Sequence, residues 1–252
     1  MRHGVERGEF IFHYQPIVDS ENGTLTCFEA LIRWQHPTRG MCYPDEFLAV
    51  LDDTGLLATV FDPLLQQAAA FQHKHHRQHG EKIGIALNLS ARMLNEEDFR
   101  QKLLERLIAR DFLPGTLILE ITEDILMQEL VEADHFLRQT QNLGARIALD
   151  DFGTGQASLG HLRQFPFDFL KIDREFIRNA DADANDASLV LAMVQLAHAF
   201  GIKVIAEGVE SESQLAFLRR LSCDYVQGFL IGVPLHEEHA FEPAHLIPLF
   251  GQ

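Results

Sequence analysis

The sequence is short of positive charge. Its 252 residues hold 21 Lys and Arg against 37 Asp and Glu, which leaves a formal net charge of −16. A surface of this charge repels nucleic-acid backbones and anionic membranes, so neither is expected as the main partner. An anionic small ligand would need local compensation of charge.

Cysteine is also scarce, and long apolar runs are missing. Cys27, Cys42 and Cys223 are odd in number and show no metal-ligand pairing, which favours a reducing compartment. No apolar run reaches the roughly 18 residues that indicate a membrane span. The N-terminal "MRHGVERGEF" lacks the apolar region of a secretory signal. We therefore expect a cytoplasmic protein, or the cytoplasmic part of a membrane-anchored one, with no membrane span in this chain.

No Pro-rich or Ser-rich linker, low-complexity tract or repeat divides the chain, so a single domain over residues 1–252 is expected. Segments of strand character lie at residues 9–18, 27–34, 82–90, 117–123, 145–151, 168–176, 203–210 and 224–232. Helical spacing recurs between them, at residues 61–76, 98–110, 131–144, 188–201 and 211–222. This alternation predicts a parallel sheet, and strands in this number favour a closed (β/α)₈ barrel over an open doubly wound sheet.

One connection departs from that pattern. "DSENGT", residues 19–24, is a short polar turn containing Asn22 and Gly23, which suits an antiparallel hairpin better than a crossover helix. The predicted fold class is therefore α/β, a modified TIM-type (β/α)₈ barrel whose first strand runs antiparallel to the others.

Polar side chains end most of the predicted strands, where the chemistry of such a barrel lies. In chain order they are Glu29, Asn88, Glu120 with Glu123, Asp150 with Asp151, Lys171 with Asp173, Glu207 with Glu210, and Gln227. Any one carboxylate alone is commonly half of a structural salt bridge. Their recurrence favours a shared site, because a carboxylate buried in an apolar strand is costly unless it is paired or bound to a metal.

The donors at this site are oxygens, without His or Cys, which suits Mg²⁺ or Mn²⁺ better than Zn²⁺. The carboxylates exceed the needs of one divalent ion, so two ions roughly 3.5–4 Å apart, sharing one carboxylate, are expected to act on a phosphoryl group. Asp150 and Asp151 are consecutive and can serve one site only where the strand ends and the backbone turns. We place that turn in "FGTG", residues 152–155, which contains Gly153 and Gly155.

Two positively charged side chains, Lys171 and Arg33, are expected beside these carboxylates. Lys171 and Asp173 share a strand face, and Lys171 is expected to be the local counter-charge that orients or helps deprotonate a water molecule. The structural alternative is a simple ion pair with Asp173. Arg33 lies four positions after Glu29 with Leu31 between them, so it faces the same way, and its guanidinium suits a phosphate oxygen.

Taken together, these residues resemble the EAL domain family, bacterial phosphodiesterases of the second messenger cyclic di-GMP. The motifs "YQPI", "EALIRW", "LNLS", "EITE", "DDFGTG", "LKID", "AEGVE" and "QGF" occur in the family's order between residues 12 and 235. The resemblance implies a (β/α)₈ barrel, a site for two divalent cations, and hydrolysis of cyclic di-GMP to linear pGpG.

The resemblance also implies a role for each matching residue. Glu29, Asn88, Glu120 and Asp150 resemble the ligands of one metal, with Asp150 bridging to the second metal, which Asp151 binds. Glu207 resembles a further ligand and, with Lys171, the group that positions and activates the attacking water. Gln15, Leu31, Arg33 and Gln227 resemble substrate contacts. Glu123 resembles the residue that braces the glycine-rich loop, and Asp173, Glu210, Gly153 and Gly155 are expected around the site.

Family members that have lost some of these residues act as receptors or protein-binding modules, so a catalytically silent cyclic di-GMP receptor is the alternative to an enzyme. A barrel that uses two metals for enolate chemistry is a third hypothesis. The departures from the family pattern are Gln156, where an aromatic residue is frequent, and Val233, where a basic or polar residue is common.

The family resemblance implies more chain than a barrel. Residues 10–235 would form the motif-bearing barrel, residues 236–252 a C-terminal helix or tail, and residues 1–9 the tail of a connecting helix. A sensory or diguanylate cyclase domain is expected ahead of that helix in the full-length protein, and a homodimer is expected because dimers are common in the family.

Two polar segments carry no site in this interpretation. "HKHHRQHG", residues 73–80, is expected to be a solvated helix end, because no second ligand cluster accompanies its histidines. "DADANDAS", residues 181–188, lacks the glycine and glutamate of a calcium loop and is expected to lead into a helix N-cap.

Overall fold

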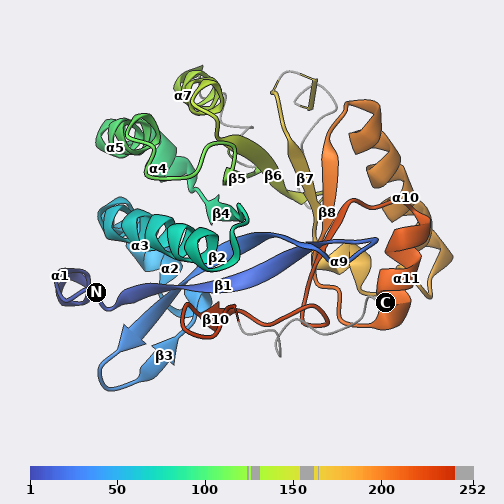
Figure 1. Cartoon of the computed structure of the whole chain (residues 1–252), viewed down its shortest axis with the longest axis horizontal. Helices are drawn as coiled ribbons and strands as arrows, with labels where there is room; N and C mark the ends of the chain where they lie inside the picture. The colour runs from blue at the N-terminus through green and yellow to red at the C-terminus, as the bar shows by residue number, and fades with distance from the viewer. Residues whose placement is uncertain (124, 126–130, 154–161, 164, 242–252) are drawn as a thin grey trace.

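The structure is a computed structural model that describes residues 1–123, 125, 131–153, 162, 163 and 165–241. Its strands curve round into a closed barrel (Figure 1). The barrel strands are β1 (Phe10–Asp19), β2 (Leu25–His36), β4 (Gly84–Asn88), β5 (Leu117–Thr122), β6 (Arg146–Phe152), β7 (Phe169–Ile172), β8 (Lys203–Ala206) and β9 (Tyr225–Gln227).

The first strand of the barrel is reversed. β1 pairs antiparallel with β2 on one side and with β9 on the other, whereas the other neighbouring barrel strands pair in parallel. The turn after β1 forms because Asp19 accepts hydrogen bonds from the backbone N–H groups of Glu21 and Asn22, and Gly23 takes a positive φ of 72°. The predicted fold class, a modified TIM-type barrel with an antiparallel first strand, is confirmed.

Helices cover the outside of the barrel (Figure 1). They include α3 (Leu56–His79), α5 (Glu97–Ile108), α7 (Val131–Asn142), α10 (Ala184–Ala199) and α11 (Glu212–Arg220), each on a segment with predicted helical spacing. The side chain of Asp183 caps α10 by accepting from the N–H groups of Asn185 and Asp186, so the expected N-cap is confirmed. Among the helices described, none is long and apolar enough to cross a membrane.

Several short elements could not be predicted from the sequence: β3 (Gly40–Cys42), η1 (Pro44–Glu46), α2 (Leu48–Asp53), α4 (Ala91–Asn95), α9 (Arg174–Ile177) and β10 (Leu235–His236). They hold too few residues for a hydrophobic period to show. β3 and β10 form because they pair with β2 and β1, which is a tertiary effect. A further short helix, α1 (Arg2–Glu6), lies in the segment expected to be a helical tail.

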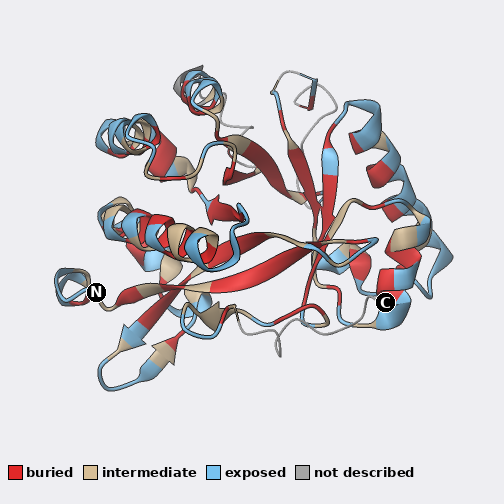
Figure 2. Cartoon of the chain, viewed as in Figure 1, coloured by how far each residue is buried: buried red, intermediate tan, exposed pale blue. Residues whose placement is uncertain are grey.

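The core has an inner and an outer layer. Inside the barrel, one apolar residue from each strand contributes to a packed cluster of Ile17, Cys27, Ala86, Ile118, Ala148, Phe169 and Ile205, with Tyr225 against it. A larger apolar cluster fills the space between the strands and the helices. The strands are accordingly buried over most of their length (Figure 2). The inner cluster fills the barrel below the carboxyl ends of the parallel strands, and polar side chains lie above it at that end.

The histidine-rich end of α3 is not wholly solvated, which corrects the expectation for residues 73–80. His75 is 5% exposed, and its ring lies 5.1 Å from the ring of Phe241 and 4.6 Å from that of His79. Phe241 also stacks on Phe71 of the same helix, at 4.4 Å between ring centroids. The correction comes from the chain beyond β10, which packs over this helix and which no local pattern indicates.

His75 should make the stability of the fold depend on pH. Burial, and then the neighbouring His79, lowers the pKa of His75 below its usual value, so the unfolded chain takes up a proton at a higher pH than the folded one. The stabilisation is complete above a pH of about 6.5 and is lost as the pH falls toward the folded pKa. Urea unfolding of His75→Phe should therefore vary less between pH 8 and pH 5 than that of the wild type, since Phe keeps the ring packing. His3→Phe at the exposed N-terminus is the control, and equal pH dependence of wild type and His75→Phe would contradict the assignment.

Candidate active site

Polar side chains meet at the mouth of the barrel, meaning the carboxyl ends of its parallel strands. Each lies two residues beyond a member of the inner apolar cluster and so shares its face of the strand. Glu29 follows Cys27, Asn88 follows Ala86, Glu120 follows Ile118, Asp150 follows Ala148, Lys171 follows Phe169, Glu207 follows Ile205 and Gln227 follows Tyr225. The strand register therefore brings together residues that lie far apart in the sequence.

Three amide side chains surround Glu29, which is 6% exposed. Asn88 Nδ2 donates to Glu29 Oε1 at 2.7 Å, and Gln227 Nε2 donates to Glu29 Oε2 at 2.6 Å. Gln227 Nε2 also donates to Gln15 Oε1 at 3.0 Å, and Gln15 lies opposite Glu29 in the β1–β2 register. The two carboxylate oxygens of Glu29 thus accept from residues of β4 and β9, and Gln15 of β1 in turn accepts from Gln227.

Lys171 lies at the centre of the carboxylates and is 1% exposed. Its ammonium group contacts the carboxylates of Glu207 at 2.7 Å, Glu120 at 2.8 Å, Asp150 at 3.3 Å and Glu29 at 3.7 Å. The predicted counter-charge is therefore placed among these acids. The structural alternative is wrong, because Asp173 instead caps α9 and accepts from the N–H of Glu175 at 2.7 Å.

Charge dominates the energetics of this cluster. Desolvation alone would lower the pKa of Lys171, but the surrounding carboxylates, Asp150 first, raise it well above its usual value, so the ammonium stays charged. Burial raises the pKa of Glu120 well above its usual value and that of Glu207 to about 8, against the opposing attraction of Lys171. For Glu29, burial is outweighed by Lys171 and the amide hydrogen bonds, which lower its pKa. One ammonium group does not neutralise all of these carboxyl groups, so the charge of the cluster favours binding of further cations.

Asp150 and Asp151 reach the same site because β6 carries a bulge. Leu149 pairs with Leu170 and Phe152 with Ile172, so β6 has one residue more than β7 over this interval. Asp151 takes the left-handed φ of 55°, and its N–H donates to Asp150 Oδ1 at 3.0 Å. The turn expected in residues 152–155 follows the end of β6 at Phe152 and begins at Gly153, whereas the bulge at Asp151 was not expected. An aspartate can supply this bulge because its short polar side chain tolerates the left-handed region.

The residues around the bulge are tightly packed. Glu123 accepts a hydrogen bond from the N–H of Gly153 at 2.9 Å, which is a contact of the kind expected of a residue that braces this loop. Gly153 has a φ of 97°, a backbone conformation that residues with a side chain adopt only with strain, and an added Cβ would also press on Met193 and Phe176. Gly155 and Gln156 lie outside the described residues, and the prediction about each of them stays open.

Arg33 is on the expected face of β2 but does not touch the acids. It is 6% exposed, its Nη1 donates to the carbonyl of Ile32 at 2.9 Å, and its guanidinium lies 5.2 Å from the centre of the Tyr43 ring. Burial lowers its pKa. Its Nε is buried and makes no hydrogen bond within the described part of the chain. Such a donor can bind a ligand oxygen, in line with the predicted substrate contact.

A cavity of about 220 Å³ opens over the cluster, lined by Gln15, Glu29, Leu31, Asp150, Lys171, Arg174, Glu207, Gly208, Glu210, Gln227, Gly228 and Phe229. Of these, Arg174, Gly208, Gly228 and Phe229 were not predicted as site residues. A larger and mostly apolar cavity of about 550 Å³ lies beside it and shares Leu31. Lys171 lines the smaller cavity together with Glu29, Asp150 and Glu207, so this cavity is the candidate active site.

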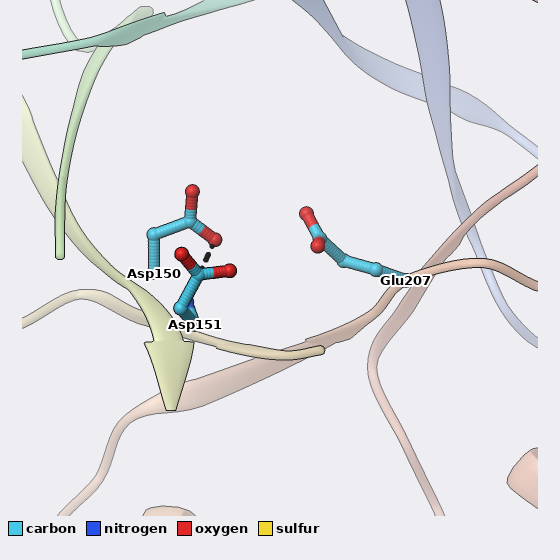
Figure 3. Close-up of side chains that lie close together, drawn as sticks. All are labelled: Asp150, Asp151 and Glu207. Atoms are coloured by element: carbon cyan, nitrogen blue, oxygen red, sulfur yellow. Dashed lines mark hydrogen bonds between the residues drawn. The ribbon is translucent and has the colours of Figure 1, made fainter. Parts of the chain in front are cut away.

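The donor set fits a divalent cation. Asp150, Asp151 and Glu207 each offer a carboxylate oxygen, and these atoms lie within 4.8 Å of one another. Asp150 and Asp151 come from the end of β6 and Glu207 from the loop after β8, and their carboxylates face a common space (Figure 3). Across the described residues, Glu120 Oε1 is also buried without a hydrogen-bond partner. Oxygen donors with surplus negative charge are what a hard cation such as Mg²⁺ or Mn²⁺ requires.

The fold and the site define a class of protein, a (β/α)₈ barrel with one reversed strand and an acidic centre built around a buried lysine. Comparison with known families then matches residues 1–234 to the EAL domain. The chain belongs to the EAL domain family, and the resemblance expected from its motifs is confirmed.

Relatives of known sequence and structure agree with this assignment. The chain is 37% identical over 238 residues to the bifunctional diguanylate cyclase/cyclic di-GMP phosphodiesterase MucR of Pseudomonas aeruginosa, covering 94% of this chain and 35% of MucR. It is 34% identical over 236 residues to the cyclic di-GMP phosphodiesterase RocR of the same organism, covering 94% of this chain and 60% of RocR. The solved structure of the PaMucR phosphodiesterase in complex with c-di-GMP matches with a TM-score of 0.88 at 37% identity, covering 94% of this chain and 96% of that one. The chain spans roughly a third of the length of MucR and of several other curated relatives, and 60% of RocR.

Replacing Lys171 by Met should destabilise the metal-free protein by about 3–5 kcal/mol, because it leaves buried carboxylates without their counter-charge. The double variant Lys171→Met/Glu120→Gln should recover part of that loss, since it removes the most deeply buried acid. The measurement is urea unfolding in EDTA followed by circular dichroism, with exposed Lys102→Met as the control. An unchanged unfolding midpoint for Lys171→Met would show that the acids do not depend on this ammonium.

Proposed function

We propose that this chain hydrolyses cyclic di-GMP to linear pGpG with the help of two divalent cations, Mg²⁺ or Mn²⁺. The observation that carries the proposal is the convergence on one charged lysine of buried carboxylates from β2, β5, β6 and the end of β8. Relatives that are named cyclic di-GMP phosphodiesterases, MucR and RocR among them, support the choice of substrate.

The residues that would hold the cations are Glu29, Asn88, Glu120, Asp150, Asp151 and Glu207. When bound, the cations would polarise the phosphodiester, lower the pKa of the attacking water and offset charge on the phosphate. Asn88 donates through Nδ2 to Glu29, which leaves its Oδ1 as the atom able to face a cation. Asp150, at the bulge, is the residue proposed to serve both cations.

Lys171 and Glu207 are proposed to position the attacking water. Lys171 Nζ lies 2.7 Å from Glu207 Oε1, so one water molecule can contact both groups. The raised pKa of Lys171 keeps its ammonium charged, and Nζ–H can donate to the water oxygen while a carboxylate oxygen of Glu207 accepts the departing proton. Lys171 thereby fixes the direction from which the oxygen approaches phosphorus.

The substrate would be held by the polar wall beside the cluster. Gln15 and Gln227 form an amide pair next to Glu29, and Leu31 lines the same cavity. The unpaired Nε of Arg33 is the group proposed to bind a phosphate oxygen, since a guanidinium suits that ligand better than any other side chain.

Neither alternative has an observation in its favour. A catalytically silent receptor would not need an intact acidic cluster with its lysine. Enolate chemistry usually needs a dedicated base beside its metals, whereas the described Lys171 is engaged by several carboxylates.

As the relatives are longer, we also propose a sensory or diguanylate cyclase domain ahead of residue 1 in the full-length protein, a homodimer, and a cytoplasmic location for this domain.

The decisive experiment is a turnover assay on cyclic di-GMP with chromatographic identification of the product. Purified protein in Mg²⁺ or Mn²⁺ should form pGpG, EDTA should stop the reaction, and renewed cation should restore it. Tight binding of cyclic di-GMP without any product in either cation would favour the receptor instead. Absence of both binding and turnover would direct attention to other substrates of a two-metal barrel.

Asp151→Asn separates cation binding from folding. Asn tolerates the left-handed conformation of this residue, so the fold should persist while one charged ligand is lost. In the wild type, Mn²⁺ should raise the melting temperature in proportion to the logarithm of its concentration once binding is saturating. That rise should be strongly reduced in Asp151→Asn. It should persist in the matched control Asp173→Asn, where Asn can still cap α9; an undiminished rise in Asp151→Asn would remove Asp151 from the cation site.

A further inference from the structure

Tyr43 is exposed at the surface, yet its ring lies against a buried side chain. Tyr43 is 57% exposed and Arg33 is 6% exposed, and Cζ of Arg33 lies 5.2 Å from the centre of the Tyr43 ring. Scattered apolar residues on a surface need no explanation. Tyr43 differs because its ring is in contact with the guanidinium group that is proposed to bind a phosphate oxygen.

The backbone brings Tyr43 to Arg33 and keeps it there. Cys42, the last residue of β3, pairs with Trp34 of β2, and continuing this antiparallel register brings Tyr43 opposite Arg33. The N–H of Tyr43 donates to Glu46 Oε1 at 3.1 Å, and its carbonyl accepts from the N–H of Glu46 at 3.0 Å. The ring is therefore carried by a turn that is fixed on both sides.

Two contacts of different kinds hold the guanidinium group of Arg33. Its Nη1 donates to the carbonyl of Ile32 at 2.9 Å, and the group lies over the Tyr43 ring, where a cation is attracted to the ring's π electrons. This attraction needs no hydrogen bond. Nε of Arg33 is buried without a hydrogen-bond partner in the part of the chain that the structure describes. The side chain is thus held while a donor stays available.

An aromatic ring suits this task better than an acid. A carboxylate would also hold Arg33, but it would accept from the same N–H groups that a phosphate needs. A free arginine would lose rotamer freedom when it bound the phosphate, and that loss weakens binding. A ring avoids both costs, because it holds the guanidinium group in advance and leaves its hydrogen bonds to the ligand.

We propose that Tyr43 is a positioning residue that holds the guanidinium group of Arg33 in place for a phosphate oxygen of the substrate. The inference rests on the proposed function, because it takes Arg33 to bind that phosphate. Tyr43 lies outside the motifs that carry the family resemblance. The inference accounts for the exposure of its ring and gives β3 and the turn after it a part in substrate binding.

The first test observes Arg33 without any substrate. Because the guanidinium group lies over the ring, the ring current of Tyr43 should shift the Nε–H proton of Arg33 upfield in ¹H–¹⁵N spectra. Tyr43→Leu should remove that shift, and Tyr43→Phe should keep it. Arg33→Lys lacks the resonance and so identifies it. Phe200→Leu, at an exposed ring after α10, is the matched control. The same resonance position in Tyr43→Leu and wild type would refute the contact.

A second test measures binding of linear pGpG in Mg²⁺ by calorimetry. Tyr43→Leu should bind roughly two- to fivefold more weakly than the wild type, as expected for loss of one cation–π contact. Tyr43→Phe, which keeps the ring, should restore the wild-type affinity. In Arg33→Ala, adding Tyr43→Leu should cause no further loss, because Tyr43 acts through Arg33. An equal loss in both backgrounds would show that Tyr43 acts independently of Arg33 and would overturn the proposal.

Turnover gives a third measurement. Tyr43→Leu should raise the KM for cyclic di-GMP by a similar factor of roughly two to five. Its kcat should change little, because the ring does not touch the reacting phosphate. A fall in kcat at constant KM would contradict a role in holding Arg33 for binding.

The outcomes separate this inference from the proposed function. Coupled effects of Tyr43→Leu and Arg33→Ala on pGpG binding, in a protein that forms no pGpG from cyclic di-GMP, would support the positioning role and refute the proposed activity. Formation of pGpG with the same KM in wild type and Tyr43→Leu would refute the positioning role and support the activity.

Discussion

The mouth of this barrel depends on the attraction between one buried ammonium and the carboxylates that surround it. Lys171 contacts Glu207, Glu120 and Asp150 within 3.3 Å, and its charge opposes the burial that raises the pKa of Glu207 and Glu120. The balance is incomplete, because the acids outnumber the lysine. The residual negative charge destabilises the metal-free site, because the buried carboxylates repel one another. The same charge would attract added cations, so the imbalance that lowers the stability of the fold also favours metal binding.

The reversed first strand determines the shape of the wall on one side of this centre. In β1 the mouth lies toward the amino end, so the residues before Gln15 continue the wall upward beside β2. β2 itself runs on to His36 and pairs with β3, which gives the hairpin a length that the parallel strands lack. Arg33 lies on this extension, beyond the acids. Its guanidinium group forms no ion pair with their carboxylates and can bind a phosphate oxygen.

The sequence predicts the parts that depend on local pattern and strand period. The alternation of segments indicates the barrel, the polar turn at residues 19–24 indicates its reversed strand, and the polar side chains that end most strands indicate a shared site of the acids and Lys171. It could not predict the burial of His75, which depends on Phe241 many residues away. Phe229 and Arg174 were not predicted as residues that line the cavity for a related reason, since exposure at a cavity is a property of the folded surface. The turn after Phe152 was predicted, but the left-handed Asp151 was not, because glycine is the ordinary signal for that conformation and the bulge uses an aspartate instead.

The bulge in β6 has a consequence for how such a site can be gained or lost. Over the interval from Leu149 to Phe152 the strand has one residue more than β7 needs for pairing. The second carboxylate is therefore an insertion into an otherwise regular strand, and the barrel would close with simpler register if Asp151 were absent. The architecture and the supply of this second carboxylate are therefore separable, because deletion of Asp151 alone would leave a regular strand that lacks it.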